Sequence, residues 1–411
     1  MADSALTATT PRASVRGLLA QHPALAVAGI YAAARIVTTV FLVIAAELSG
    51  PSSRFGADAT IASLSMGWDA QWYRLVGTAG YPSQLPVDVS GNVVNNAWAF
   101  MPLYPALSRA LSVVFFGQYP LAAVTLAIVA GYLACLVMYH LLHERLGAGT
   151  ALWAVALLAA CPLGALFQMG YAESLFLLWL FLALWALVLR RLVWLYLLIP
   201  LMGYTRPGVL AFALLLGLYG IFRWIRRRRD PLPVTHAVHI VVLGLLAVLV
   251  GFSWQVIAGV ATGDPSAYLD TELSWRRGWI GDDGGFVPLH GFVVGTGLWF
   301  RLWGLPAVLG YAALGAAVVA FAALLLFEPH VKRLGTELRL WSASYAVYLL
   351  LVFFPQSSIF RLLLPLAPLY GAMAAPRHPA WRGGMLVLGL IGQWWWIREM
   401  LALGNTYTQI P

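Results

Sequence analysis

Long apolar segments recur along the whole chain, separated by shorter polar ones. The hydrocarbon core of a bilayer is about 30 Å thick and needs about 20 apolar residues per helix. The pattern therefore predicts an all-helical, polytopic membrane protein with about 11 transmembrane helices, several of them shorter than a full span. The segments expected to form these helices are 23–48, 121–142, 152–168, 175–189, 192–203, 208–225, 237–259, 305–327, 340–354, 362–375 and 385–403.

A long polar and aromatic loop, residues 50–99, separates the first two apolar segments. The stretch 100–116 that follows is apolar, but it contains Pro102, Pro105 and Arg109. Prolines and an arginine in so short a stretch favour a helix lying in the membrane interface over a helix crossing the bilayer.

The composition agrees with a membrane protein. Only 10% of the residues are charged and 61% are hydrophobic, whereas soluble domains carry about 25% charged residues. Two cysteines, Cys135 and Cys161, both lie in apolar segments, which excludes a disulfide framework. The expected organisation is a short cytoplasmic tail at 1–21 and a single polytopic membrane domain at 22–411, with a catalytic external loop at 50–99 and a second external loop at 260–300.

The charges indicate an orientation, because lysine and arginine concentrate on the cytoplasmic side of membrane proteins. With the N-terminus inside, the inner segments hold 15 of the 25 basic residues and 5 of the 16 acidic ones, giving 15 − 5 = +10. The rest of the chain carries 10 − 11 = −1. The net charge of +9 thus reflects membrane orientation and does not indicate a nucleic-acid partner. Counting 100–116 as a full span would place the arginines at 226–229 outside, against this rule.

The first external loop contains a lone carboxylate among large aromatic residues. Asp69 lies in the run from Trp68 to Arg74, together with Gln71 and Tyr73. A carboxylate in such a place can accept a proton as a general base, and aromatic faces stack on sugars. Alternatively, Asp69 caps a short interfacial helix and the tryptophans belong to the interfacial belt. This loop alone supports both interpretations equally.

Four further charged residues stand near or within the expected spans. Glu173 opens the fourth span, where the helix dipole alone would favour an acid. Arg206 and Arg361 stand at the outer starts of spans, where the helix dipole does not stabilise a cation. Arg206 therefore needs an anionic partner, either Glu173 or a phosphate. Arg35 lies near the middle of the first span, and a charge at that depth indicates function unless an acid pairs with it.

Together these residues suit a transferase that uses a lipid-phosphate donor. Arg206, Arg361 and Arg35 would hold the phosphate, while Asp69 would deprotonate an acceptor hydroxyl. The sequence contains no P-loop, no Gly-rich dinucleotide turn and no HExxH motif, and its 8 histidines are scattered. We therefore predict no metal and no cofactor.

Several motifs resemble those of a known family. They are WDAQWYRLVGTAGYP at 68–82, FMPLYP at 100–105, YAESLFLL at 171–178, TRPG at 205–208 and FRLLLPLAPLY at 360–370. In this order they resemble the PIG-V-like mannosyltransferases, which belong to the type C (GT-C) glycosyltransferase superfamily. The resemblance extends over most of the chain, from Arg35 to Tyr370.

The resemblance implies a GT-C fold, an inverting reaction, a polyprenyl-phosphate sugar as donor and a lipid or glycan as acceptor. It implies that Asp69 is the catalytic base, and we expect substrate contacts from Trp68, Gln71, Tyr73 and Glu173. Because the chain is compact and nearly free of lysine, we expect a bacterial plasma-membrane protein with its active site on the extracytoplasmic face.

Two other classes remain open. One is a transporter or flippase for a lipid-linked or anionic solute, although the inner halves of the spans offer few polar residues for a continuous path. The other is a non-catalytic membrane subunit. Acceptor recognition would be sought in the charged loop 263–285, for which a solvated external loop is the favoured interpretation. Its charged residues are Asp264, Asp270, Glu272, Arg276, Arg277, Asp282 and Asp283.

Overall fold

The computed structural model describes residues 22–281, 285–406 and 408–411. Apart from one isolated bridge between Val87 and Val93, the regular elements of these residues are helices. The predicted all-helical class is therefore confirmed. The expected cytoplasmic tail, 1–21, lies outside the described residues.

Within the described part of the chain, five helices are long and apolar enough to cross a membrane. The shortest has 18 residues, which at 1.5 Å per residue is about 27 Å, close to the thickness of the hydrocarbon core. The chain thus has the helices of a membrane protein. They are α2 (Pro23–Glu47), α6 (Tyr119–Leu146), α10 (Val209–Arg226), α11 (Val234–Thr262) and α14 (Ala307–Phe327).

The other six expected spans form shorter or interrupted helices, so the count of 11 stays a prediction. Proline accounts for several interruptions, since it lacks the amide hydrogen that continues a helix; Pro162 follows α7, and Pro365 and Pro368 lie in η5. The elements are α7 (Ala148–Ala159) with η3 (Gly164–Gln168), α8 (Glu173–Val188), η4 (Leu192–Trp194) with α9 (Leu195–Gly203), α16 (Thr336–Val352), α17 (Ile359–Leu362) with η5 (Leu364–Leu369) and α18 (Tyr370–Met373), and α19 (Pro379–Trp395) with the π-helix η6 (Trp396–Ala402).

Short helices also form between the long ones. The stretch 100–116 contains the expected helix. Its position in the membrane interface stays a prediction. These elements are α3 (Ile61–Ser65), α4 (Asp69–Ala79), η1 (Ala97–Ala99), α5 (Leu103–Ser112), η2 (Val113–Phe115), α12 (Ala267–Ile280), α13 (His290–Leu302) and α15 (Pro329–Arg333).

Helix α8 lies at the centre of the molecule. It is apolar all round, as expected of a helix buried on every side, and 12 of its 16 residues are buried. It packs against α6, α9 and α16. Glu173, its first residue, is thereby carried into the interior at one end of the helix.

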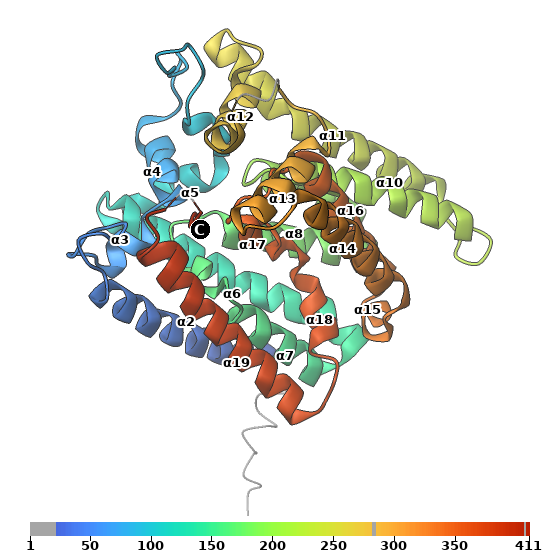
Figure 1. Ribbon diagram of the computed structural model, residues 1–411. Coiled ribbons are helices and arrows are strands. Elements are labelled where there is room, and N and C mark those ends of the chain that lie inside the picture. The colour runs from blue at the N-terminus through green and yellow to red at the C-terminus, as the bar shows by residue number, and fades with distance from the viewer. Residues whose placement is uncertain (1–21, 282–284, 407) are drawn as a thin grey trace, which may run out of the picture.

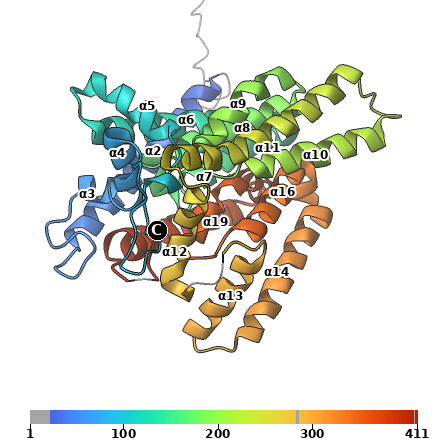
Figure 2. The ribbon, with the colours of Figure 1, turned by 90° about the horizontal axis from the view of Figure 1, so that it is seen from above.

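The helix ends define two sides of the molecule. In Figure 1, α3, α4 and α5 lie at one end of the long helices, and the turn joining α10 to α11 lies at the other together with α15. Helix α10 pairs with α11 and α13 pairs with α14, and Figure 2 shows the two pairs as separate arms.

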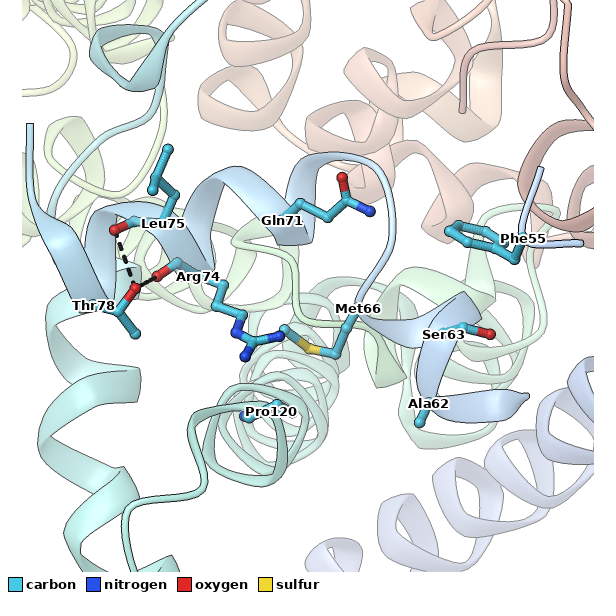
Figure 3. A pocket seen from close by; sticks show the side chains of 9 residues that line it. All are labelled: Phe55, Ala62, Ser63, Met66, Gln71, Arg74, Leu75, Thr78 and Pro120. Carbon is cyan, nitrogen blue, oxygen red and sulfur yellow. Dashed lines mark hydrogen bonds between the residues drawn. The ribbon is translucent and has the colours of Figure 1, made fainter. Parts of the chain in front are cut away.

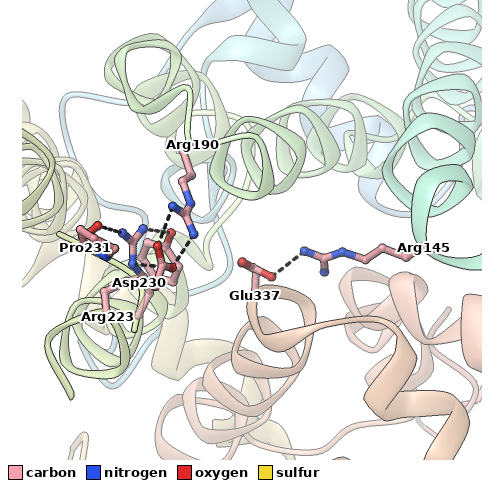
Figure 4. Close-up of polar contacts among 7 residues, drawn as sticks. Arg145, Arg190, Arg223, Asp230, Pro231 and Glu337 are labelled. Carbon is pink, nitrogen blue, oxygen red and sulfur yellow. Dashed lines mark hydrogen bonds and ion pairs between the residues drawn. The ribbon is translucent and has the colours of Figure 1, made fainter. Parts of the chain in front are cut away.

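Three ion pairs connect chain segments that the charge count assigns to the cytoplasmic side (Figure 4). Arg145 lies 2.9 Å from Glu337, and Asp230 contacts both Arg190, at 2.5 Å, and Arg223, at 3.5 Å. We call these the loop-end ion pairs. The pairs of Arg145 with Glu337 and of Arg190 with Asp230 each join two such segments, and the orientation in a membrane stays a prediction.

Candidate functional site

Four of the charged residues singled out in the sequence meet in space. Arg361 Nη1 lies 2.6 Å from Asp69 Oδ2, and Arg361 Nε lies 3.3 Å from Glu173 Oε1. Arg206 Nη1 contacts the same Glu173 oxygen. We call these four residues the carboxylate–arginine cluster. Of the two anionic partners expected for Arg206, the structure shows Glu173.

The cluster is buried to different depths. The Glu173 side chain is 3% exposed and the Arg361 side chain 11%, whereas the Asp69 side chain is 22% exposed. Burial by itself lowers the pKa of Arg361, but the charges of Asp69 and Glu173 outweigh this effect and raise it. The two carboxylates and the two guanidinium groups have a net charge of zero. Their mutual attraction offsets the free-energy cost of taking four charges out of water. Glu173 is the shared centre, and Asp69 is the carboxylate open to solvent.

A tight turn places Asp69 at the start of α4. Trp68, the residue before it, has a φ of 52°, a left-handed conformation that is uncommon for a bulky side chain. Its indole Nε1 donates a hydrogen bond of 3.1 Å to the Leu401 carbonyl oxygen, and the Arg54 guanidinium lies 4.4 Å from the ring centroid. Trp68 thus holds the turn in place. A Cβ at Gly67 would come within 2.2 Å of the Phe55 ring, so that ring would have to shift.

Asp69 is not the capping residue of α4. The N-cap position belongs to Trp68, which makes no side-chain cap, and Asp69 is the first helical residue. The helix dipole favours an acid there, but the Asp69 carboxylate contacts the distant Arg361 instead of a nearby backbone amide. The capping alternative is therefore not the arrangement in the structure.

Two tyrosines line the cluster. Tyr171 is fully buried, and the Arg361 guanidinium lies 5.5 Å from its ring centroid. Tyr73, a predicted substrate contact, is buried, and its pKa is raised by burial and is also affected by the charges of Arg206, Glu173 and Asp69. Sequence reasoning named Tyr73 but missed Tyr171, even though Tyr171 stands in the same motif as Glu173.

Gln71 points away from the cluster. It lies on the opposite face of α4 from Asp69 and lines a pocket of about 580 Å³ with Arg74, Leu75 and Thr78 (Figure 3). The spacing explains this division, since residues three and four apart share a helix face. The structure therefore brings Tyr73 and Glu173 to the Asp69 side and leaves Gln71 on the other, while the Trp68 ring contacts Leu401 and Arg54.

Arg35 lies at the break between α7 and η3. The last carbonyl groups of a helix lack partners within it, and the Arg35 guanidinium donates to the Ala159 oxygen at 2.6 Å and to the Gly164 oxygen. The rings of Tyr31 and Phe167 flank it, with centroids 5.1 and 5.4 Å away. None of these contacts involves the carboxylate–arginine cluster, so a phosphate-binding role for Arg35 stays a prediction.

The second loop departs from expectation. A solvated loop was favoured for 263–285, but α12 within it is anchored, with Thr271 fully buried and accepting a 2.8 Å hydrogen bond from Asn96. Arg277 donates to the Val93 carbonyl oxygen at 2.7 Å. Hydrogen bonds thus attach α12 to the first loop. For the face of α12 that packs there, the interpretation as a solvated loop is wrong. Asp282 and Asp283 lie outside the described residues.

The chemistry available is that of phosphate binding beside a base. A guanidinium group has five N–H donors, and the carboxylates contact only two nitrogens of Arg361 and one of Arg206. Among the described residues, no group of three or more His, Cys, Asp and Glu side chains is placed to hold a metal ion.

No known family matches the chain, and no curated protein is significantly similar to it. The described residues thus define a class, an all-helical protein with five helices long and apolar enough to cross a membrane and with a buried cluster of paired charges.

Proposed function

We propose that the protein is a membrane glycosyltransferase of the GT-C type, an inverting mannosyltransferase related to the PIG-V-like family. It moves a sugar from a polyprenyl-phosphate donor to a lipid or glycan acceptor. The observation that carries the proposal is the contact between the partly exposed Asp69 carboxylate and Arg361, which places a proton acceptor beside an anion-binding group.

The proposed reaction requires a proton acceptor and groups that bind the departing phosphate. An acceptor hydroxyl attacks the anomeric carbon, its proton passes to Asp69, and the bond from that carbon to the phosphate oxygen breaks. A β-linked donor then gives an α-mannoside. Arg361 and Arg206 hold the departing lipid phosphate with the N–H groups that the carboxylates leave unused, by charge-assisted hydrogen bonds.

The remaining residues have supporting roles in this proposal. Glu173 keeps the two arginines together, since both contact the same carboxylate oxygen. Trp68 fixes the turn before Asp69, and Tyr73 lines the cluster. Gln71 faces the pocket beside α4 and would contact a substrate only there.

We place the site on the extracytoplasmic face of a bacterial plasma membrane, with the N-terminus in the cytoplasm. The excess of basic residues in the inner segments supports this orientation. The pair between Arg190 and Asp230 lies beyond the C-terminal ends of α8 and α10. The carboxylate–arginine cluster lies at the N-terminal ends of the same two helices.

Replacing Asp69 by Asn tests the proposal. Transfer from radiolabelled polyprenyl-phosphate mannose into membrane lipids and glycans is measured in a null background, for the wild type and Asp69→Asn at equal protein level. The change keeps the size of the side chain and removes the base, so we expect transfer to fall by about 10²- to 10⁴-fold.

Asp58→Asn is the matched control, because Asp58 is an exposed carboxylate of the same loop. It should transfer as the wild type does. Undiminished transfer by Asp69→Asn would make Asp69 structural, and absence of transfer by the wild type would favour a transporter or a non-catalytic subunit.

A further inference from the structure

A second carboxylate faces Asp69 across a contact between two helices. On α4, Asp69 and Trp72 are three residues apart, and on α12, Glu272 and Trp275 are three apart, so each pair shares one helix face. The rings of Trp72 and Trp275 meet edge to face, with centroids 6.0 Å apart. The carboxyl groups of Asp69 and Glu272 therefore flank the same contact, and their charges interact.

Hydrogen bonds from two other segments fix this face of α12. Asn96 bonds to Thr271, and Ser274 Oγ donates to Asn95 Oδ1 at 2.7 Å. Gln356 Nε2, in the segment that leads to α17 and Arg361, donates to the Trp275 carbonyl oxygen at 3.4 Å. The helix that carries Glu272 is thus tied to the loop that contains Asp69 and to the segment that leads to Arg361.

The surroundings of Glu272 are mostly aromatic. Tyr268 on its own helix bonds to its carboxyl, Tyr348 of α16 and Asp69 of α4 interact with its charge, and α11 and η1 contribute the rings of Trp254 and Trp98 nearby. Burial raises the pKa of Glu272 to about 7; the Tyr268 hydrogen bond lowers it, and the Asp69 charge raises it. Near neutral pH the carboxyl is therefore present in both forms.

We propose that Glu272, in its protonated form, binds a hydroxyl group of a sugar acceptor and so holds the neighbouring, attacking hydroxyl against Asp69. The proposal rests on the proposed function and names the acceptor class, a glycan or glycolipid. The rings of Trp72, Trp275 and Phe100 beside the two carboxyls offer the apolar faces against which a sugar ring packs.

The two carboxyl groups differ in what they can do. The Asp69 carboxylate only accepts hydrogen bonds, whereas a protonated Glu272 also donates one. A sugar with adjacent hydroxyls can give its proton to Asp69 from one and accept the Glu272 hydrogen bond with the other. When Glu272 ionises, this donor is lost and a second negative charge stands beside Asp69. Acceptor binding should therefore weaken as the pH rises through 7.

The test measures the half-saturating acceptor concentration for sugar transfer between about pH 6 and about pH 9. The full-length protein is used with an acceptor fraction extracted from membranes. For the wild type we expect this concentration to rise about tenfold for each pH unit above the pKa of Glu272. For Glu272→Gln we expect it to be independent of pH, because an amide donates at every pH and carries no charge.

Asp270→Asn is the matched control, since Asp270 lies on the same helix and bonds to Ser266; it should keep the wild-type pH dependence. Tyr268→Phe is a second variant that preserves the ring. It removes a hydrogen bond that lowers the pKa of Glu272. The pH profile of Tyr268→Phe should therefore keep the shape of the wild-type profile and lie at higher pH. Donor half-saturation should be unchanged in all of these variants.

The outcomes separate the two proposals. Equal pH profiles for the wild type and Glu272→Gln, or an unshifted profile for Tyr268→Phe, would overturn the role of Glu272 while leaving the transferase intact. A wild type that transfers no sugar would overturn the proposed function and this inference together. Retention of acceptor activity after periodate cleavage of the sugar diols in the extract would exclude a sugar as the acceptor.

Discussion

The two ends of α8 and α10 carry the same kind of interaction in different surroundings. At one end, the carboxylate–arginine cluster buries Glu173, which is 3% exposed. At the other end, the pair between Arg190 and Asp230 is more open, with Arg190 45% and Asp230 37% exposed; only Arg223, which also contacts Asp230, is as buried as Glu173. Exposed ion pairs contribute little, whereas removing one partner of a buried pair leaves an uncompensated charge.

The difference indicates separate purposes. The loop-end ion pairs join residues at helix ends and in loops, among them Arg145 and Glu337, which are 192 residues apart in the chain. The cluster instead brings together residues from four distant segments and leaves guanidinium N–H groups unused beside a solvent-accessible carboxylate. A buried group of charges with unused donors is typical of a binding site rather than of a structural brace.

The largest effect should follow from removing the centre of the cluster. Glu173→Gln leaves Arg206 and Arg361 without their shared carboxylate, so we expect the free energy of unfolding to fall by about 3–5 kcal/mol. Thermal unfolding of the purified protein in detergent measures it.

The exposed pair between Arg398 and Glu399 supplies the control. Glu399→Gln should change stability by about 1 kcal/mol or less. If Glu173→Gln and Glu399→Gln lowered the free energy of unfolding by the same small amount, the buried cluster would be no more important for stability than an exposed ion pair. Combining Glu173→Gln with Arg206→Gln should recover part of the loss, because the double variant buries one unpaired charge fewer.

A smaller effect should follow from removing Arg361, one of the two proposed phosphate ligands. Hydrogen bonds to charged groups contribute about 1.5–3 kcal/mol, so Arg361→Gln should raise the half-saturating donor concentration by about 10- to 100-fold. Its effect on acceptor half-saturation should be smaller. Kinetic measurement of transfer at varied donor concentration decides this, with Arg398→Gln as the control. Unchanged donor dependence would remove Arg361 from the phosphate site.

The smallest effect belongs to the loop-end ion pairs. The Arg190 guanidinium holds the pKa of Asp230 below its usual value. Any stabilisation from this pair is therefore present at neutral pH and is lost as the pH falls through the lowered pKa. Arg190→Gln removes only the exposed partner and leaves the contact of Asp230 with the buried Arg223 in place. It should leave transfer unchanged and weaken this acid dependence, which melting temperatures measured at several pH values would show. A large loss of transfer would show that the two ends are coupled.

The sequence by itself determined the helical class and the long helices. Hydropathy along the chain is a local property, and a run such as 307–327 has no alternative to an apolar helix. It also indicated the charged residues of the cluster, because a carboxylate or an arginine near an apolar span costs free energy unless it is paired or has a function. Asp69, Glu173, Arg206 and Arg361 were all found in this way.

Only the tertiary structure decided which of these residues meet. Helix breaks after Ala159 and at Pro365 depend on what can satisfy the freed backbone groups, and Arg35 does so for α7. Glu272 lay unnoticed in a polar loop, because its surroundings come from the packing of α12 against α11 and η1 and from the contact of Trp275 with Trp72. Contacts between residues so far apart in the chain depend on how helices pack, and hydropathy does not encode that packing.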